Sequence, residues 1–220
     1  ILLGGFAAGM VLFIVSVGLS VTMGLMGFVN LAHGGFAMIG GYVTVILMRG
    51  MVIPLRIATD WFTIDLGMTI SIKMSFIPSL VVAFIVVAAF SIVLERLLYS
   101  RLYRAGELEQ VLFTIGLVFI FIASTPLLIG PENQQIQLPK MLQGQIDLGI
   151  TTYRTYSVVL IGVGFIFMVG LWLGFERTRM GAQIRAAVDN RRMAESLGIN
   201  VNRLFTFTFA FGSGMAALGG

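Results

Sequence analysis

Charge is the property that this sequence has least of. Charged residues make up 11% of the chain and hydrophobic residues 58%, and the mean hydropathy is +0.99. An average soluble domain contains about 25% charged residues. So few charges cannot cover a surface that faces water. Most of the surface must therefore face lipid.

Cysteine is absent, which excludes disulfides and every metal or redox site built on thiols. The single histidine, His33, is not part of an HExxH motif, and the chain contains no G-x-S-x-G motif. A hydrolase needs a nucleophile with a base, or a set of metal ligands. We therefore expect no enzyme activity and no cofactor. The formal net charge of +4 is interpreted as loop charge that orients a membrane protein, not as a nucleic-acid surface.

The charged residues that are present lie between long charge-free runs, which are residues 1–48, 74–94, 110–131, 155–175 and 204–220. A helix needs about 20 apolar residues to cross the bilayer core. Each of the three inner runs suffices for one span, the first suffices for two, and the last stops at the end of the chain. The sequence predicts an all-α polytopic membrane protein, a helical transmembrane bundle with about six spans. These form one transmembrane domain over residues 1–220, which we expect to be a fragment that lacks further C-terminal spans.

Lysine and arginine are unevenly divided between the loops on the two sides. Loops 95–109 and 176–203 hold nine of the 14, and loops 49–73 and 130–154 hold five. Because cytoplasmic loops carry the excess of basic residues, the first two loops are predicted to be cytoplasmic.

Between positions 64 and 72, apolar and polar residues alternate, which indicates a short strand.

A polar interruption follows the first predicted span. Asn30 and His33 are three positions apart, so a helix would place them on one face, and glycines flank them, including Gly34 and Gly35. Polar groups at membrane depth face a cavity or a partner, and an interrupted helix frees backbone groups that line a pathway. These four residues are candidates for a substrate path or gate. The alternative is a polar tether between helices, which is common in membrane bundles.

The linker 176–203 contains the pattern of a short amphipathic helix over residues 191–197. Asp189 with Asn190 offers an N-cap, and Gly198 is a natural C-terminal stop. The apolar residues of its predicted face are Met193, Ala194 and Leu197. A helix of this kind docks into a groove on a partner protein or lies on anionic lipid, and the spacing alone leaves both open.

These two segments resemble the permeases of branched-chain amino acid ABC transporters. Residues 27–34 read G-F-V-N-L-A-H-G and are similar to a G-x-x-N-x-A-H-G stretch of that family. The family's cytoplasmic linker is similar to this chain at Arg179-Met180-Gly181, Arg185-Ala186, Met193-Ala194 and Leu197-Gly198-Ile199-Asn200-Val201, and Glu95-Arg96 after the third predicted span also fits. The similarity extends over most of the chain, although loop 49–73 is longer than usual.

The resemblance implies a multi-pass transmembrane permease domain in the bacterial inner membrane. Two such permeases, identical or different, form one pathway through the lipid bilayer. Cytoplasmic ABC ATPase subunits drive transport, and an external binding protein delivers the substrate. By analogy, residues 176–203 form the cytoplasmic coupling linker, and residues 189–200 within it form the coupling helix that meets the ATPase. The residues assigned to this coupling element are Arg185, Asp189, Arg191, Met193, Ala194, Leu197 and Gly198.

Two other functions fit the same sequence. Urea and short amides are substrates within the same family, and nothing in the predicted spans excludes them. A stand-alone secondary transporter or channel is the other alternative, but ion-driven carriers place acidic residues within their spans. None of the ten acidic residues lies well inside a predicted span, which favours an external energy source.

Overall fold

The computed structural model describes residues 2–26, 30–50, 56–59, 62–65, 74–102, 105–129, 139, 142–147 and 152–220. The long helices in this part of the chain are α1 (Leu2–Met26), α2 (His33–Arg49), α3 (Phe76–Leu94), α5 (Glu107–Ile129), α6 (Thr155–Arg177) and α9 (Val201–Gly219). The short elements are the π-helical turn η1 (Glu95–Tyr99), α4 (Ser100–Leu102), α7 (Arg179–Asp189), α8 (Arg191–Ser196) and the strands β1 (Arg56–Thr59), β2 (Phe62–Asp65), β3 (Gln145–Asp147) and β4 (Thr152–Arg154).

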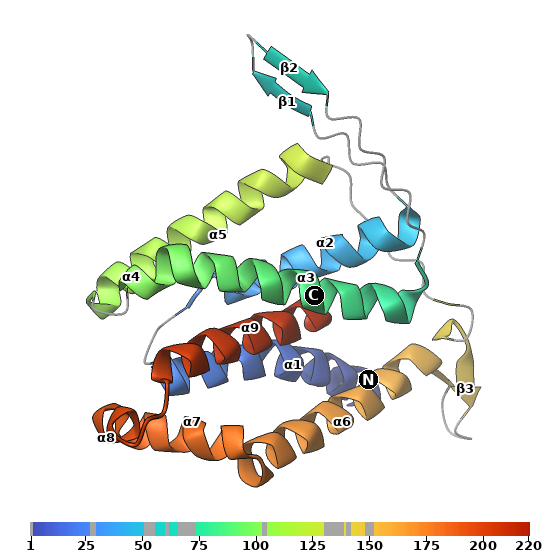
Figure 1. Ribbon diagram of the computed structural model, residues 1–220. Helices are drawn as coiled ribbons and strands as arrows, with labels where there is room; N and C mark the ends of the chain where they lie inside the picture. The colour runs from blue at the N-terminus through green and yellow to red at the C-terminus, as the bar shows by residue number, and fades with distance from the viewer. Residues whose placement is uncertain are drawn as a thin grey trace.

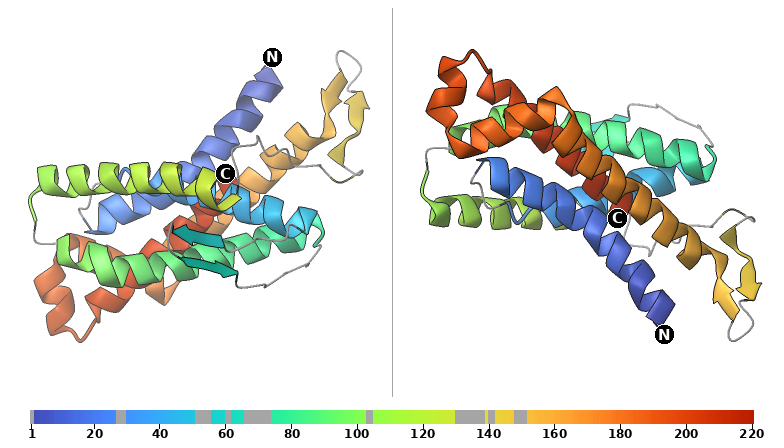
Figure 2. Two further views of the ribbon diagram at one scale, coloured as in Figure 1. Left: turned by 90° about the horizontal axis from the view of Figure 1, so that it is seen from above. Right: turned by 90° about the horizontal axis from the view of Figure 1, so that it is seen from below.

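The long helices lie side by side and form a bundle with two ends (Figures 1 and 2). Helix α9 lies at the centre, because it contacts α1, α2 and α3 and buries most of its side chains from Leu204 to Ala217. Helix α6 packs on α1, and α5 on α2. The elements α4 and α8 lie together at one end (Figure 1). The two predicted cytoplasmic linkers therefore share one end of the molecule, as the charge count requires.

Within the described residues, four segments are long and apolar enough to cross a membrane by themselves, namely Leu3–Gly24, Phe76–Leu102, Glu107–Leu127 and Thr155–Arg177. Helices α2 and α9 are less apolar than α1 and α3; both contain glycine and threonine, and α9 also contains serine. They are tolerated in the bundle because they pack against other helices instead of lipid. The chain is an all-α polytopic membrane protein, as predicted, and four of the six long helices in the described residues qualify as spans by themselves.

Helices α1 and α9 approach each other most closely at two glycines. A Cβ atom on Gly212 would lie 2.9 Å from the carbonyl oxygen of Gly18, so the two backbones are in direct contact. Small residues at a crossing point let membrane helices approach this closely. The contact fixes α9 against α1 at the level of His33, whose ring lies next to Gly18.

One predicted boundary is wrong. The linker expected to begin at Glu95 is helical for its first eight residues, because α3 continues through η1 and α4 to Leu102. The strand expected at positions 64–72 overlaps β2 only at its start, and residues 66–73 lie outside the described residues. Strand β2 pairs with β1 in an antiparallel hairpin, and β3 pairs with β4 in a second one. Both hairpins are short insertions between helices and leave the fold class unchanged.

Candidate functional site

The break between α1 and α2 is organised around the side chain of Asn30. This side chain is fully buried, and its Oδ1 accepts a hydrogen bond from the backbone N–H of Ala32 at 3.0 Å. The same oxygen accepts a second hydrogen bond from the hydroxyl of Tyr99 at 3.1 Å. Tyr99 belongs to η1, which is 69 positions away in the sequence. One amide oxygen therefore shapes the chain before α2 and ties it to the end of α3.

His33, the first residue of α2, is buried against α1. Its Nε2 lies 3.1 Å from the backbone carbonyl oxygen of Val15, and because a carbonyl can only accept, Nε2–H is the donor. A Cβ atom on Gly18 would lie only 2.7 Å from this nitrogen. The imidazole fits at this crossing because residue 18 is glycine.

An aromatic cluster closes the space beside the break. The ring of Phe36 is fully buried, and its centroid lies 6.3 Å from that of His33, 5.7 Å from that of Phe121 and 5.8 Å from that of Phe209. The rings of Phe209 and Tyr99 are 4.9 Å apart. Side chains from α2, α5, α9 and η1 thus surround the two polar residues and separate them from lipid.

The four residues predicted for a path or gate are brought together but differ in access. Asn30, His33 and Gly35 are buried, and a Cβ atom on Gly35 would run into the ring of Phe121. Gly34 is exposed and has open space around it. Within the described residues, Asn30 Nδ2 and His33 Nδ1 have no hydrogen-bond partner. Two buried polar atoms are thus unsatisfied, while the other atoms of these side chains hold helices together.

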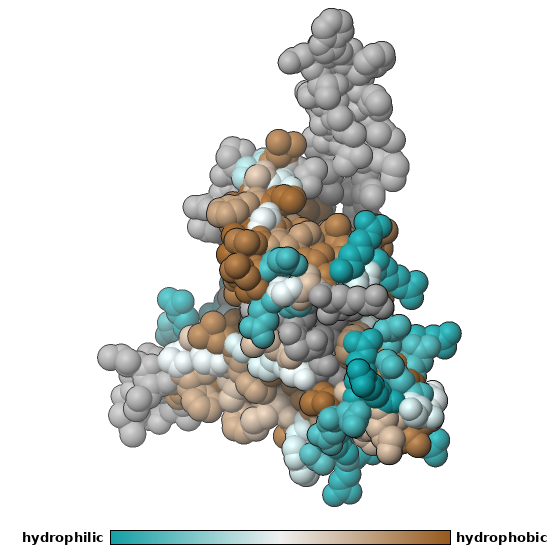
Figure 3. All heavy atoms as spheres, turned by 90° about the vertical axis from the view of Figure 1, so that its left-hand side faces the viewer, coloured by the Kyte–Doolittle hydropathy of each residue, from teal (hydrophilic) through white to brown (hydrophobic). Residues whose placement is uncertain are grey.

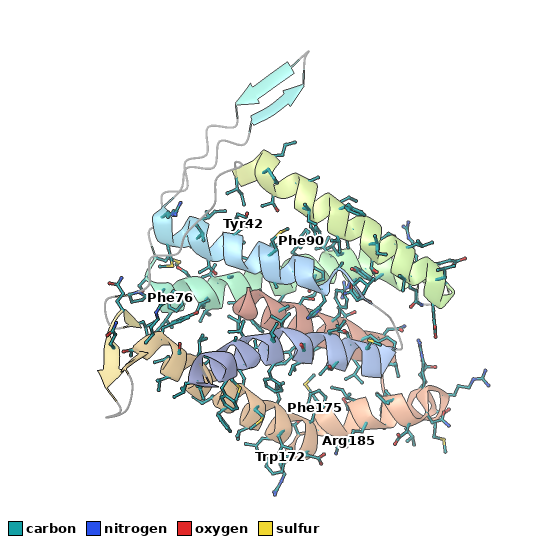
Figure 4. All side chains as sticks on the ribbon, turned by 180° about the vertical axis from the view of Figure 1, so that it is seen from behind. Tyr42, Phe76, Phe90, Trp172, Phe175 and Arg185 are labelled. Carbon is teal, nitrogen blue, oxygen red and sulfur yellow. The ribbon has the colours of Figure 1, made fainter. Side chains whose placement is uncertain are left out.

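The linker begins with a sharp turn at Thr178 between α6 and α7. The hydroxyl of Thr178 accepts a hydrogen bond from the backbone N–H of Gly181 at 3.1 Å and so caps α7. The guanidinium of Arg185 donates to the carbonyl of Phe175 and lies 3.8 Å from the carboxylate of Glu176. Phe175 and Arg185 lie close together at this junction (Figure 4). Arg185 therefore fastens α7 to the end of α6.

The short helix predicted at residues 191–197 is α8, and its ends are sharply defined. Its N-cap is Asn190, whose Oδ1 accepts from the backbone N–H of Met193 at 3.0 Å, and not Asp189, which is the last residue of α7. Gly198 has φ +81°, a conformation that glycine adopts without a steric penalty. The N–H groups of Gly198 and Ile199 bond to the carbonyls of Glu195 and Ala194, which completes a Schellman stop.

The two sides of α8 have different surroundings. Met193 and Leu197 are 61% and 73% exposed, and they point away from the bundle. Ala194 is 1% exposed and packs with Ala187, Val201, Leu204 and Phe205. The prediction that Ala194 joins the exposed apolar face is therefore wrong, because this residue seats α8 on the rest of the molecule.

Arg191 fastens α8 to α9. Its Nε donates to Glu195 at 3.0 Å, its terminal nitrogen donates to the side chain of Asn202 at 3.3 Å, and its guanidinium lies 5.1 Å from the ring centroid of Phe205. Figure 3 shows hydrophilic residues gathered at the end of the molecule that carries α8. Arg191 lies at this polar end, but its contacts stabilise the fold. The exposed apolar side chains of Met193 and Leu197 do not take part in holding α8 against the bundle.

Glu95 and Tyr99 contribute to this region and were not predicted as site residues. The structure places Glu95 in the last third of the apolar segment Phe76–Leu102, where the residue is 3% exposed and its carboxylate accepts from the hydroxyl of Thr206 at 2.9 Å. The sequence signal was a glutamate directly after an apolar run, which equally describes the start of a polar loop.

The comparisons with known proteins agree with this architecture. The family model described as the permease component of the branched-chain amino acid transport system matches residues 1–220. The chain is 27% identical to the high-affinity branched-chain amino acid transport system permease protein LivH of Escherichia coli strain K12 in an alignment 221 residues long, which covers 98% of the chain and 67% of the relative.

Two further relatives extend this similarity. The permease protein BraD of Pseudomonas aeruginosa, from a system of the same description, is 27% identical in an alignment 222 residues long. The alignment covers 99% of the chain and 67% of the relative. A probable branched-chain amino acid transport permease protein LivH of Methanocaldococcus jannaschii is 20% identical over 220 residues, 100% of the chain and 64% of the relative. No solved structure matches. The chain belongs to the family of permease components of branched-chain amino acid transport systems.

Proposed function

We propose that this chain is the membrane-spanning permease subunit of an ABC importer for branched-chain amino acids. It forms the translocation pathway, and a separate cytoplasmic ATPase subunit hydrolyses the ATP. The observation that carries this proposal is α8, a helix with a defined start and stop that holds Met193 and Leu197 exposed at the end of the bundle. The names of the relatives support the substrate class.

The exposed pair on α8 has the properties of a docking element. Apolar side chains next to each other on a rigid helix gain free energy when a partner groove removes them from water. Arg191 and Ala194 anchor the helix from the other side, so that little ordering is needed when the partner binds. A helix held this firmly is better suited to transmit force to the bundle than a free surface helix would be.

The remaining parts of the assembly follow from this function. The end that carries α4 and α8 is cytoplasmic, because it carries the basic linkers. A second permease, identical or different, completes the pathway across the lipid bilayer of the bacterial inner membrane, and an external binding protein delivers the substrate. Residues 1–220 act as one permease domain, with 176–203 as its coupling linker.

The break at residues 30–35 acts as a gate element in this proposal. Asn30 and His33 hold the start of α2 against η1 and α1, while the exposed Gly34 leaves the backbone accessible beside them. An interrupted helix of this kind can expose backbone groups to a passing substrate when the helices move. The hydrogen bonds equally support a purely structural tether, and the transport assay described in the Discussion separates the two roles.

Docking is tested by replacing both exposed anchors, as Met193→Ala with Leu197→Ala. The double variant is expected to lose co-purification with the ATPase, or to keep it and lose substrate-stimulated hydrolysis, because the apolar anchors dominate such contacts. A matched control is Leu108→Ala with Leu112→Ala, a pair of the same spacing on α5 that is 72% and 60% exposed. Normal association and normal stimulation in the anchor variant would contradict the docking role, and altered lipid binding alone would assign α8 to the membrane surface.

One observation favours a second function, that of an ion-coupled transporter without an ATPase. The carboxylate of Glu95 is buried at the end of a span, where acidic residues in such carriers bind the coupling ion. The two functions differ in energy source. Uptake into vesicles that requires ATP and survives an ionophore supports the importer, while uptake that is abolished by the ionophore and independent of ATP supports the carrier.

Competition with urea and acetamide in the same assay tests the short-amide alternative.

A further inference from the structure

The π-helical turn η1 contacts both functional segments of the chain. The N–H of Ser100 bonds to the carbonyl of Glu95, five positions back, which is the bond that defines a π-turn. Glu95 and Tyr99 are both buried within this turn. Tyr99 donates to Asn30 at the break, and Glu95 accepts from Thr206 near the start of α9. A single turn of five residues thus connects two regions that are remote in the sequence.

Thr206 is connected to α8 through Asn202. The hydroxyl of Thr206 also lies 3.1 Å from the backbone carbonyl oxygen of Asn202, one turn earlier on α9, so its single hydrogen is shared between this oxygen and Glu95. The side chain of Asn202 accepts from Arg191, the first residue of α8, at 3.3 Å. Helices α8 and α9 are held together by this bond and by the apolar cluster around Ala194. Movement of α8 is therefore expected to move the start of α9 with it.

The ring of Tyr99 also packs on that of Phe209 with centroids 4.9 Å apart, so η1 contacts the middle of α9 as well. A polar pocket of about 440 Å³ lies between η1 and the α8–α9 corner, lined by Glu95, Arg96, Ser100, Arg191, Asn202, Arg203 and Thr206. The bond between Thr206 and Glu95 crosses one side of this pocket. A buried carboxylate is costly and is retained where it has a specific partner or function. Loss of this bond is expected to loosen the α8–α9 corner against η1, while the packing of Tyr99 on Phe209 remains.

We propose that Glu95 and Thr206 form the positioning contact through which η1 holds the α8–α9 corner and joins it to the Asn30 break. In this arrangement a displacement of α8 by its partner reaches the start of α2 through α9, Glu95 and Tyr99. The inference rests on the proposed docking of an ATPase at α8. Glu95 is a positioning residue, because it acts through Thr206 and Tyr99.

The test compares variants that remove either side of the bond. Thr206→Val removes the donor and Glu95→Ala the acceptor, while Glu95→Gln keeps an oxygen that can accept from Thr206. The matched control is Thr208→Val on the same helix, because Thr208 is buried and its hydroxyl has no partner among the described residues. The first two variants are expected to retain ATPase association and lose about tenfold in substrate-stimulated hydrolysis and transport, and Glu95→Gln is expected to restore most of it.

A second measurement reports on position without the ATPase. The chain contains no cysteine, so spin labels can be placed at Leu97→Cys on η1 and Arg192→Cys on α8, both exposed positions. The distance distribution between them is expected to broaden or shift in Thr206→Val and Glu95→Ala, and to stay unchanged in Thr208→Val and Glu95→Gln. An unchanged distribution in the first two variants overturns the positioning contact. A changed distribution with normal hydrolysis and transport overturns its role in coupling.

The two proposals fail in different ways. If the unaltered permease does not associate with an ATPase, the proposed function fails, and the distance measurement still decides whether Glu95 and Thr206 hold the corner. If association is normal and Thr208→Val reduces coupling as much as Thr206→Val does, the effect comes from general disturbance of α9. That result contradicts a specific role for the bond.

Discussion

At the scale of single residues, the hydrogen bonds of Asn30 determine the break. Its Oδ1 accepts from both Ala32 and Tyr99, and the side chain is fully buried. A leucine at this position fits the apolar surroundings but accepts neither bond. Both of these hydrogen bonds would then be lost, and a buried donor left unsatisfied costs about 1–3 kcal/mol.

The predicted result for Asn30→Leu is a strong loss of transport at normal expression, larger than the loss for Leu31→Ala. Leu31 is the matched neighbour because its side chain is exposed. Uptake of labelled leucine into cells or proteoliposomes measures both. Unchanged uptake with reduced thermal stability would leave the break with a structural role only, and unchanged uptake with unchanged stability would remove both roles.

At the scale of elements, the contact between α1 and α9 depends on the absence of a side chain at Gly18. A Cβ atom there would meet the backbone of Gly212 and the imidazole of His33. Overpacking of this kind typically costs about 1–3 kcal/mol. Gly18→Ala is therefore expected to lower the unfolding temperature in detergent. Gly9→Ala on the same helix is the control, because a Cβ atom at Gly9 has open space, and an equal loss in both variants would contradict the crossing-point explanation.

The helices and turns also show which parts of the structure can be predicted from the sequence. Charge-free runs predict the long helices because the bilayer requires continuous apolar length, and cap and stop residues predict α8 because their bonds are local. The π-turn at Glu95 was not predictable, since a glutamate followed by arginine reads as the start of a loop. The partners Tyr99 and Thr206 were not predictable either, because contacts between remote helices depend on tertiary packing. Ala194 was assigned to the wrong side of α8 for the same reason: spacing defines a face but not what covers it.

At the scale of the whole molecule, the distribution of arginine and lysine predicts how the bundle is oriented in the membrane. Glu95, the first residue of linker 95–109, bonds to Thr206 on α9, three positions beyond the end of linker 176–203. The two linkers hold nine of the 14 basic residues. Because translocation of basic segments is disfavoured, we expect the end that carries α4 and α8 to lie in the cytoplasm. That orientation would place α8 on the side where ATP is available, which the proposed importer requires.

Labelling of single cysteines tests this orientation directly, since the chain contains no cysteine of its own. Ser100→Cys lies at the end with α4 and α8, and Gln145→Cys lies in the hairpin before α6; both positions are exposed. A reagent that cannot cross the membrane is expected to label Gln145→Cys in intact cells, and to label Ser100→Cys only after the membrane is opened. The reverse pattern would place α8 outside the cell, where no ATPase could reach it. Because both variants are scored in intact and opened cells, a cysteine that is merely unreactive is recognised by its failure to label under either condition.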